Sequence, residues 1–266
     1  MPRTKLPVGP VAIWGLVKEL RVAAEDVKPL AVTGPPSLAG ALRKDLARGG
    51  DAKLIRETPV EGSAVVVHVV AGPHSADDER VLRAAHTAKV PIVVLLADPD
   101  LDDRAVPYVL ATDVLRVERG RGFPLDAIAR RVAHKLGERG TALAAQLPIV
   151  RRAVCAELIE SFARKNGIVG AAVFIPGVDM PVLTLNQLRL VLRIGAAYGE
   201  ELDTQRLPEI LGVIGGGFGF RMVARELLDL VPVAGWVVKG AVAYVGTRAI
   251  GEAAVRYFEA RASAAR

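Results

Sequence analysis

The stretch LAVTGPPSLAG, Leu30 to Gly40, decides the fold of the first half of the chain. Strand-forming residues run into a glycine-proline turn, and residues 41–48 continue with a helical pattern. A strand, a glycine-containing turn and a helix form the start of a phosphate-binding loop, because backbone N–H groups of the turn and the helix start wrap the phosphates. The stretch therefore predicts an α/β domain of the nucleotide-binding kind.

The same turn lacks the residues that handle phosphate. A working loop has the pattern G-x-x-x-x-G-K-[ST], in which the lysine contacts the outer phosphates and the hydroxyl holds Mg²⁺. Here Gly34 and Gly40 are one residue too far apart. Pro35-Pro36 have no N–H to donate, and Ala41-Leu42 take the places of Lys and Ser/Thr. The loop is degenerate, and if nucleotide binding survives, we expect Gly34, Ser37 and Gly40 to contribute to it.

Strand and helix patterns alternate from residue 28 to about residue 136. Residues 64–70 are almost entirely apolar and β-branched and residues 91–96 are apolar, which is typical of parallel strands buried on both faces. Ser75, with Asp78 three positions later, forms a capping box that starts a helix. Further strands are expected at 30–34, 52–57 and 114–117, and helices at 38–48, 75–88 and 125–136. The pattern predicts a parallel sheet covered by helices.

This order of elements over residues 28–137 resembles the Era-like GTPase domain. In that family the strand matching residues 92–96 ends in an [NT]-K-x-D motif, whose aspartate contacts guanine. The matching residues here are Ala97-Asp98-Pro99-Asp100, which keep Asp100 and lose Asn-Lys. The Mg²⁺ motif D-x-x-G would fall at residues 71–74, AGPH, without an aspartate. The resemblance implies a catalytically silent GTPase-like domain, with Asp100 as its remaining nucleotide-contacting residue.

Other site signatures in the chain are weak. Cys155 is the single cysteine, which excludes an internal disulfide and predicts a buried thiol on a helix. His68 lies in an apolar strand and is predicted to be a core histidine, and the histidines share no metal spacing. The aspartates of residues 98–103 lack the pattern of a calcium loop. We expect no catalytic residue, no metal site and no cofactor.

From about residue 138 the chain changes to apolar, glycine-rich helical patterns. Pro148 interrupts or starts a helix, residues 183–198 are amphipathic, and Pro208 opens a further helix. Glycine costs a helix roughly 1 kcal/mol against alanine, so these glycines are expected to permit close approach between helices. The residues expected to pack helices together or contact a membrane are Gly212, Gly215, Gly216, Gly219, Pro232, Gly235 and Gly240.

The length of the apolar runs argues against clean membrane spans. A span needs about 20 mostly apolar residues, and Asp179, Asp229 and Lys239 interrupt the candidate runs. Glycine spacing of the small-x-x-x-small kind serves tight helix pairs both in lipid and in water. The sequence therefore favours buried or membrane-dipping hairpins and leaves the choice between them open.

Residues 148–259 resemble the YcjF-like domain of unknown function that is appended to bacterial Era-like GTPases. The matching stretches are IPGVDMP at 175–181, LNQLR at 185–189, IGAAYG at 194–199, VPVAG at 231–235 and GTRAIG at 246–251. The resemblance implies association with the bacterial inner membrane, on its cytoplasmic side, together with a GTPase or GTPase-like partner.

Composition limits the classes of partner. The net charge of +6 favours an anionic partner, such as an acidic membrane surface. The basic residues are dispersed and only 5% of residues are aromatic, so we expect no nucleic-acid binding.

The N-terminus leads into no apolar signal segment, which indicates a cytoplasmic or cytoplasmic-side protein.

These patterns together predict three segments in the 266-residue chain. Residues 1–27 form an N-terminal amphipathic helix, residues 28–137 a degenerate P-loop GTPase-like α/β domain, and residues 138–266 an all-α, glycine-rich, YcjF-like domain. The expected function is a non-catalytic, membrane-associated adaptor or scaffold that binds a protein partner or itself. A nucleotide-responsive GTP-binding regulator and a soluble self-associating interaction module are the alternatives.

Overall fold

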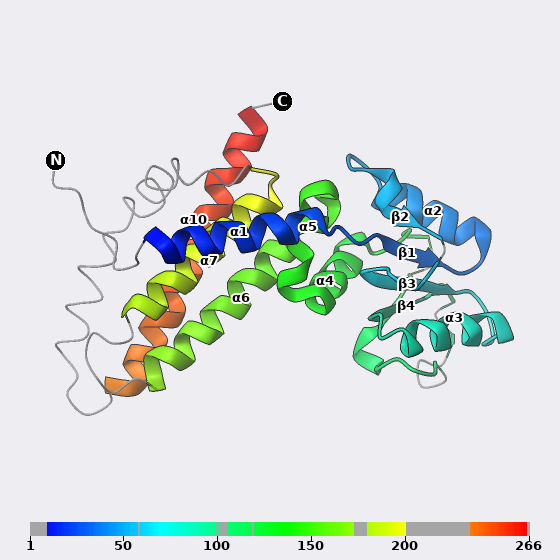
Figure 1. Ribbon diagram of the computed structural model, residues 1–266. Helices are drawn as coiled ribbons and strands as arrows, with labels where there is room; N and C mark the ends of the chain where they lie inside the picture. Colours follow the sequence, from blue (N-terminus) through cyan, green and yellow to red (C-terminus); the bar gives the residue numbers. More distant parts are fainter. Residues whose placement is uncertain are drawn as a thin grey trace. The chain divides into compact units, whose positions relative to one another are not determined.

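The computed structural model describes residues 10–57, 59–98, 100–101, 106–118, 120–172, 180–200 and 235–264. The chain divides into two compact units (Figure 1). One is the α/β unit, residues 26–154, and the other is a helical unit that joins residues before 26 to residues after 154. The sequence patterns placed these divisions after residues 27 and 137. The helical unit is therefore discontinuous in sequence, with the α/β unit inserted into it.

The α/β unit contains a five-stranded, all-parallel sheet with the order β2-β1-β3-β4-β5. β1, β3 and β4 are buried at every position, which agrees with sequences that are apolar except for Thr33 and His68. An α/β class with a parallel sheet is therefore confirmed. The strands are β1 (Leu30–Thr33), β2 (Ile55–Arg56), β3 (Val65–Val70), β4 (Ile92–Leu96) and β5 (Val114–Arg116).

The strand expected at residues 52–57 is shorter than predicted. Its first residues form a 3-10 turn, η1 (Ala52–Leu54), and only β2 pairs with the sheet. The side chain of Asp51 accepts a hydrogen bond from the Lys53 N–H and so favours the turn over a strand. β2 is an edge strand of two residues as a result.

Three helices pack on the sheet. α2 (Pro36–Leu46) contacts β1, β2 and β3, whereas α3 (Ala76–Thr87) and α4 (Leu125–Leu136) contact β3 and β4. α3 begins at the predicted capping box of Ser75 and Asp78, and α4 coincides with the predicted helix. The remaining short helices that the structure describes in this unit are η3 (Ala111–Asp113), η4 (Gly137–Arg139) and α5 (Gly140–Gln146).

The described helices of the second unit are α1 (Pro10–Glu25), most of α6 (Pro148–Ala172), α7 (Met180–Ala197) and α10 (Gly235–Ala264). Leu16, Val17 and Leu20 of α1 pack on Leu188 and Leu192 of α7. α7 also packs on α10. Within the described residues, none of the helices has the length and apolarity that a membrane span requires.

Glycines bring α6 and α10 into close contact. A Cβ atom on Gly240 would lie 2.9 Å from the carbonyl oxygen of Gly167, and one on Gly170 would lie 2.9 Å from the Cβ of Ala243. Among the predicted packing or membrane-contact residues, Gly240 lies at this contact and Gly235 begins α10. Gly212, Gly215, Gly216, Gly219 and Pro232 lie outside the described residues.

Polar side chains also join the helices of this unit. Asn166 on α6 is fully buried, donates to the Thr247 hydroxyl on α10 at 2.8 Å and accepts from the Asn186 amide on α7 at 2.8 Å. Cys155 on α6 is buried, as predicted.

Candidate functional site

The carboxyl ends of β1 and β3 form the candidate site of the α/β unit. The strand order means that the chain leaves β1 to one side to form β2 and returns to the other side to form β3. In open parallel sheets, ligands bind outside the carboxyl ends of the strands at such a switch point. The turn at Gly34 follows β1 here and residues 71–74 follow β3, so the predicted nucleotide loop lies where this architecture places a ligand.

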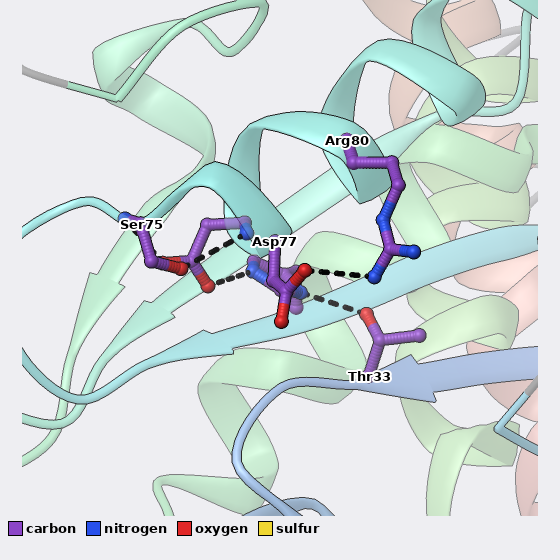
Figure 2. Close-up of polar contacts among 6 residues, drawn as sticks. Thr33, Ser75, Asp77 and Arg80 are labelled. Atoms are coloured by element: carbon purple, nitrogen blue, oxygen red, sulfur yellow. Dashed lines mark hydrogen bonds and ion pairs between the residues drawn. The ribbon is translucent and has the colours of Figure 1, made fainter.

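Thr33, His68 and Asp78 form a hydrogen-bonded chain at this position (Figure 2). The register of β1 and β3 pairs Thr33 with His68. His68 Nδ1 lies 2.8 Å from Thr33 Oγ1, and His68 Nε2 lies 2.9 Å from Asp78 Oδ1. Because a carboxylate only accepts hydrogen bonds, Nε2 carries the proton and Nδ1 accepts from the Thr33 hydroxyl.

Asp78 connects this chain to the start of α3, where Ser75 is the N-cap (Figure 2). Its Oδ2 accepts from the Ser75 backbone N–H at 2.9 Å and from the Ser75 hydroxyl at 2.6 Å. The Ser75 oxygen accepts in turn from the Asp78 N–H. Thr33 and His68 are both almost fully buried. The chain thus satisfies its buried polar atoms internally and links two strands to a helix cap.

Burial dominates the electrostatics of His68. Loss of water lowers the pKa of His68 below its ordinary 6.5, even though the hydrogen bond and charge of Asp78 favour protonation, and His74 adds to the lowering. For Asp78, burial raises the pKa, but the hydrogen bonds from Ser75 and His68 outweigh it and leave the pKa below its ordinary 3.8. A neutral imidazole therefore faces an ionised carboxylate at neutral pH.

The turn at Gly34 packs directly on β3. Gly34 has a φ of +126°, and a Cβ atom there would lie 2.3 Å from the carbonyl oxygen of Val69, so only glycine fits. Pro35 is the N-cap of α2 and Pro36 its first residue, which removes two of the four N–H groups that a helix start leaves open. Ser37 is exposed in the first turn of α2.

Of the other predicted nucleotide contacts, Gly40 lies inside α2 and Asp100 follows β4. Gly34, Ser37 and Gly40 share one turn and helix. Asp100 is exposed, and its N–H donates to Asp98 Oδ1 at 3.1 Å. β3 lies between β1 and β4 in the sheet, so Asp100 and the Gly34 turn follow strands that are not neighbours.

Sequence reasoning missed the partners of His68. It predicted a core histidine, and the burial confirms this, but Thr33 and Asp78 were not expected to bond to it. One signal was present, because Asp78 of the capping box carries a second carboxylate oxygen that the cap does not use. The bond between Thr33 and His68 depends on the register of β1 and β3, which the sequence does not contain.

Comparison with known proteins finds no matching family model, no similar curated protein and no similar solved structure. Within the part of the chain that the structure describes, no group of His, Cys, Asp and Glu side chains is arranged to hold a metal ion. The GTPase-like and YcjF-like assignments stay predictions from the sequence.

Proposed function

We propose that this protein is a non-catalytic adaptor at a membrane surface, in which a GTPase-like α/β unit without phosphate chemistry binds a partner and the helical unit contacts the membrane. The absence of catalysis is inferred from the turn after β1. In this turn Gly34 lies against Val69 and is followed by two prolines.

The chemistry of phosphoryl transfer supports this assignment. Such transfer depends on N–H groups, a lysine and Mg²⁺ that position the phosphates and stabilise the developing charge. The turn offers prolines where N–H donors are needed, and Ala41 and Leu42 where the cation and the hydroxyl would lie. His68 and Asp78 are bonded to one another, and His68 is almost fully buried, so its imidazole is not open to a substrate.

The outer face of α1 supports the membrane contact. Trp14 is 61% exposed and Val22 is 59% exposed. The ammonium of Lys18 lies 5.5 Å from the centre of the Trp14 ring. An exposed tryptophan beside a cation suits the headgroup level of a bilayer with acidic lipids. The opposite face of α1 packs on Leu188 and Leu192, so among the described residues of this unit the tryptophan face is the one left open to a bilayer.

Titration with fluorescent GTP and ATP analogues, combined with a phosphate-release assay, tests the non-catalytic part. We expect no saturable binding and no release of phosphate, because the turn cannot surround a phosphate with donors. Saturable binding that Gly34→Val abolishes would replace the adaptor with a nucleotide-responsive regulator.

Flotation tests the membrane part with the full chain and vesicles of phosphatidylcholine with or without phosphatidylglycerol. We expect flotation with the anionic vesicles, release by salt, and loss of flotation in Trp14→Ala. Leu110→Ala, which removes an equally exposed apolar side chain from the α/β unit, should float normally. Survival through a carbonate wash would mean insertion rather than surface contact. Failure to float with any vesicle would overturn the membrane part and leave a soluble interaction module.

A further inference from the structure

A cavity lies at the amino-terminal edge of the sheet, the edge opposite the switch point at Gly34. Its volume is about 310 Å³, and its walls come from the end of α3, the start of β4, the segment at residues 108–113 and the last turn of α4. We propose that this cavity is a binding site for a small organic carboxylate with an aromatic body. The proposal stands without the adaptor function, since it concerns other residues of the α/β unit.

Lys89 at the cavity occupies a backbone position that suits glycine. Its φ is +55°, and it follows Ala88, the C-cap of α3. Its N–H donates to the His86 carbonyl and the N–H of Val90 to that of Ala85, which is the hydrogen-bond pattern of a Schellman helix end. The left-handed residue of that motif is usually glycine, because other residues are strained there. Here the same position carries a long cationic side chain beside the cavity.

Tyr108, on another wall of the cavity, also has a positive φ. Its φ is +65°, in a turn that follows Pro107, where a bulky residue is strained. Lys89 and Tyr108 are the two non-glycine residues with positive φ that the structure describes, and both line this cavity. Backbone strain of this kind collects at ligand-binding positions, where the surrounding structure holds it in place.

The charges around the cavity favour an anion. The buried carboxylate at the cavity is that of Asp113. It accepts a hydrogen bond from the Lys135 ammonium and lies 3.8 Å from an Arg131 nitrogen, so the negative charge of Asp113 is already neutralised. The ammonium of Lys89 has no ion-pair partner among the residues that the structure describes. A carboxylate that enters the cavity would give Lys89 a charge-assisted hydrogen bond.

Aromatic and apolar side chains define the body of the ligand. The His86 and Tyr108 rings lie 5.1 Å apart with an angle of 36° between their planes. Leu110, beside them, is 69% exposed. The pKa of Arg83 is raised, first by a hydrogen bond with the Tyr108 hydroxyl and then by one with the Glu79 carboxylate. An aromatic acid would stack on this wall while its carboxylate reaches Lys89.

Nuclear magnetic resonance titration of the full chain with benzoate tests the proposal, with benzyl alcohol as the uncharged probe of the same shape. We expect benzoate to shift the resonances of His86 and Tyr108 saturably and benzyl alcohol to bind at least about tenfold more weakly, since it lacks the charge-assisted bond. Equal binding of the two probes, or the absence of a saturable shift with benzoate, would overturn the proposal.

Variants at Lys89 separate binding from folding. Lys89→Asn should weaken benzoate binding about tenfold while the fold is retained, because asparagine tolerates a positive φ better than lysine does. Lys89→Arg keeps the cation and should keep the affinity. Lys44→Gln, which removes an exposed lysine from α2, is the matched control and should bind as the unmodified chain does. Unchanged affinity in Lys89→Asn would contradict the assignment.

A short peptide that ends in phenylalanine, with a free or an amidated carboxylate, identifies the source of the ligand. Tighter binding of the free-acid peptide than of benzoate, again lost in Lys89→Asn, supports a chain terminus as the natural carboxylate. The reverse order supports a small aromatic acid. Equal binding of the free and amidated peptides, together with unchanged affinity for benzoate in Lys89→Asn, would overturn the site altogether.

Discussion

His68 is a titratable residue inside a strand that is otherwise apolar and fully buried. Its neutral form bonds to Thr33 and Asp78, and its charged form would have to be stabilised without water. The consequence is a link between the protonation of one side chain and the stability of the α/β unit.

The pH dependence of stability follows from the lowered pKa of His68. In the unfolded chain the imidazole takes up a proton near pH 6.5, whereas in the folded chain it does so only at lower pH. The unfolded state therefore binds more protons in that interval, and the free energy of unfolding falls as the pH drops below 6.5. Urea unfolding at a series of pH values measures this slope.

His68→Gln is the control for that slope, because glutamine does not titrate. Its unfolding free energy should change less than that of the unmodified chain as the pH falls below 6.5. Asp78 adds a separate loss at lower pH, since its stabilising ionised form disappears only below its ordinary pKa of 3.8. Identical slopes in the two proteins would show that His68 is not the group responsible.

Three glycines of the α/β unit differ in what an added Cβ would meet. Gly34→Ala should destabilise by about 3 kcal/mol, because the Cβ meets the Val69 backbone at a positive φ. Gly62→Ala, with positive φ and open space, should lose about 1 kcal/mol. Gly40→Ala, inside α2 and clear of close contacts, should gain up to about 1 kcal/mol. Urea unfolding gives the order, and equal losses in all three would contradict the packing of the Gly34 turn.

The sequence predicts single residues well where the cause is local. The capping box of Ser75 depends on a neighbour three positions away, whereas the glycine requirement at Gly34 depends on Val69 of another strand. The bond between Thr33 and His68 joins residues 35 positions apart and depends on strand register. The strained positions of Lys89 and Tyr108 carry no sequence signal, because glycine is absent from both.

At the scale of elements, the contact between α6 and α10 gives a direct test of glycine packing. Gly240→Ala places a Cβ 2.9 Å from the Gly167 carbonyl oxygen and 3.0 Å from the Ala171 Cβ. We expect a loss of about 2 kcal/mol in the free energy of unfolding, since backbone atoms on α6 cannot move aside. Gly246→Ala on the same helix meets no atom within 4 Å and should gain up to about 1 kcal/mol. A gain in both variants would mean that the two helices are not in close contact.

Elements with strong periodicity or continuous apolar runs were predicted closely. β3, β4 and α4 agree with the sequence patterns to within one residue at each end. β2 was predicted too long, because the side chain of Asp51 supports a 3-10 turn that the apolar pattern does not reveal. α1 was predicted as amphipathic, but the pattern did not tell which helix it covers.

At the scale of the whole molecule, the chain builds one unit from its two ends and the other from its middle. Glu19 on α1 pairs with Arg189 on α7, 170 residues away. No local pattern indicates such a contact. The sequence therefore placed a separate N-terminal segment where the structure has a helix that belongs to the helical unit.

The division into two units predicts where a core mutation will act. Leu20 is almost fully buried against α7, and Leu20→Ala should lower the stability of the helical unit by about 3 kcal/mol through the cavity it leaves. Hydrogen exchange should then show lost protection in α1 and α7, with β1 and β3 unchanged, because the latter belong to the other compact unit. Val22→Ala, which removes an exposed side chain from the same helix, should leave exchange as it is. Equal loss of protection in β1 and β3 would mean that the two units unfold together, and that α1 stabilises both.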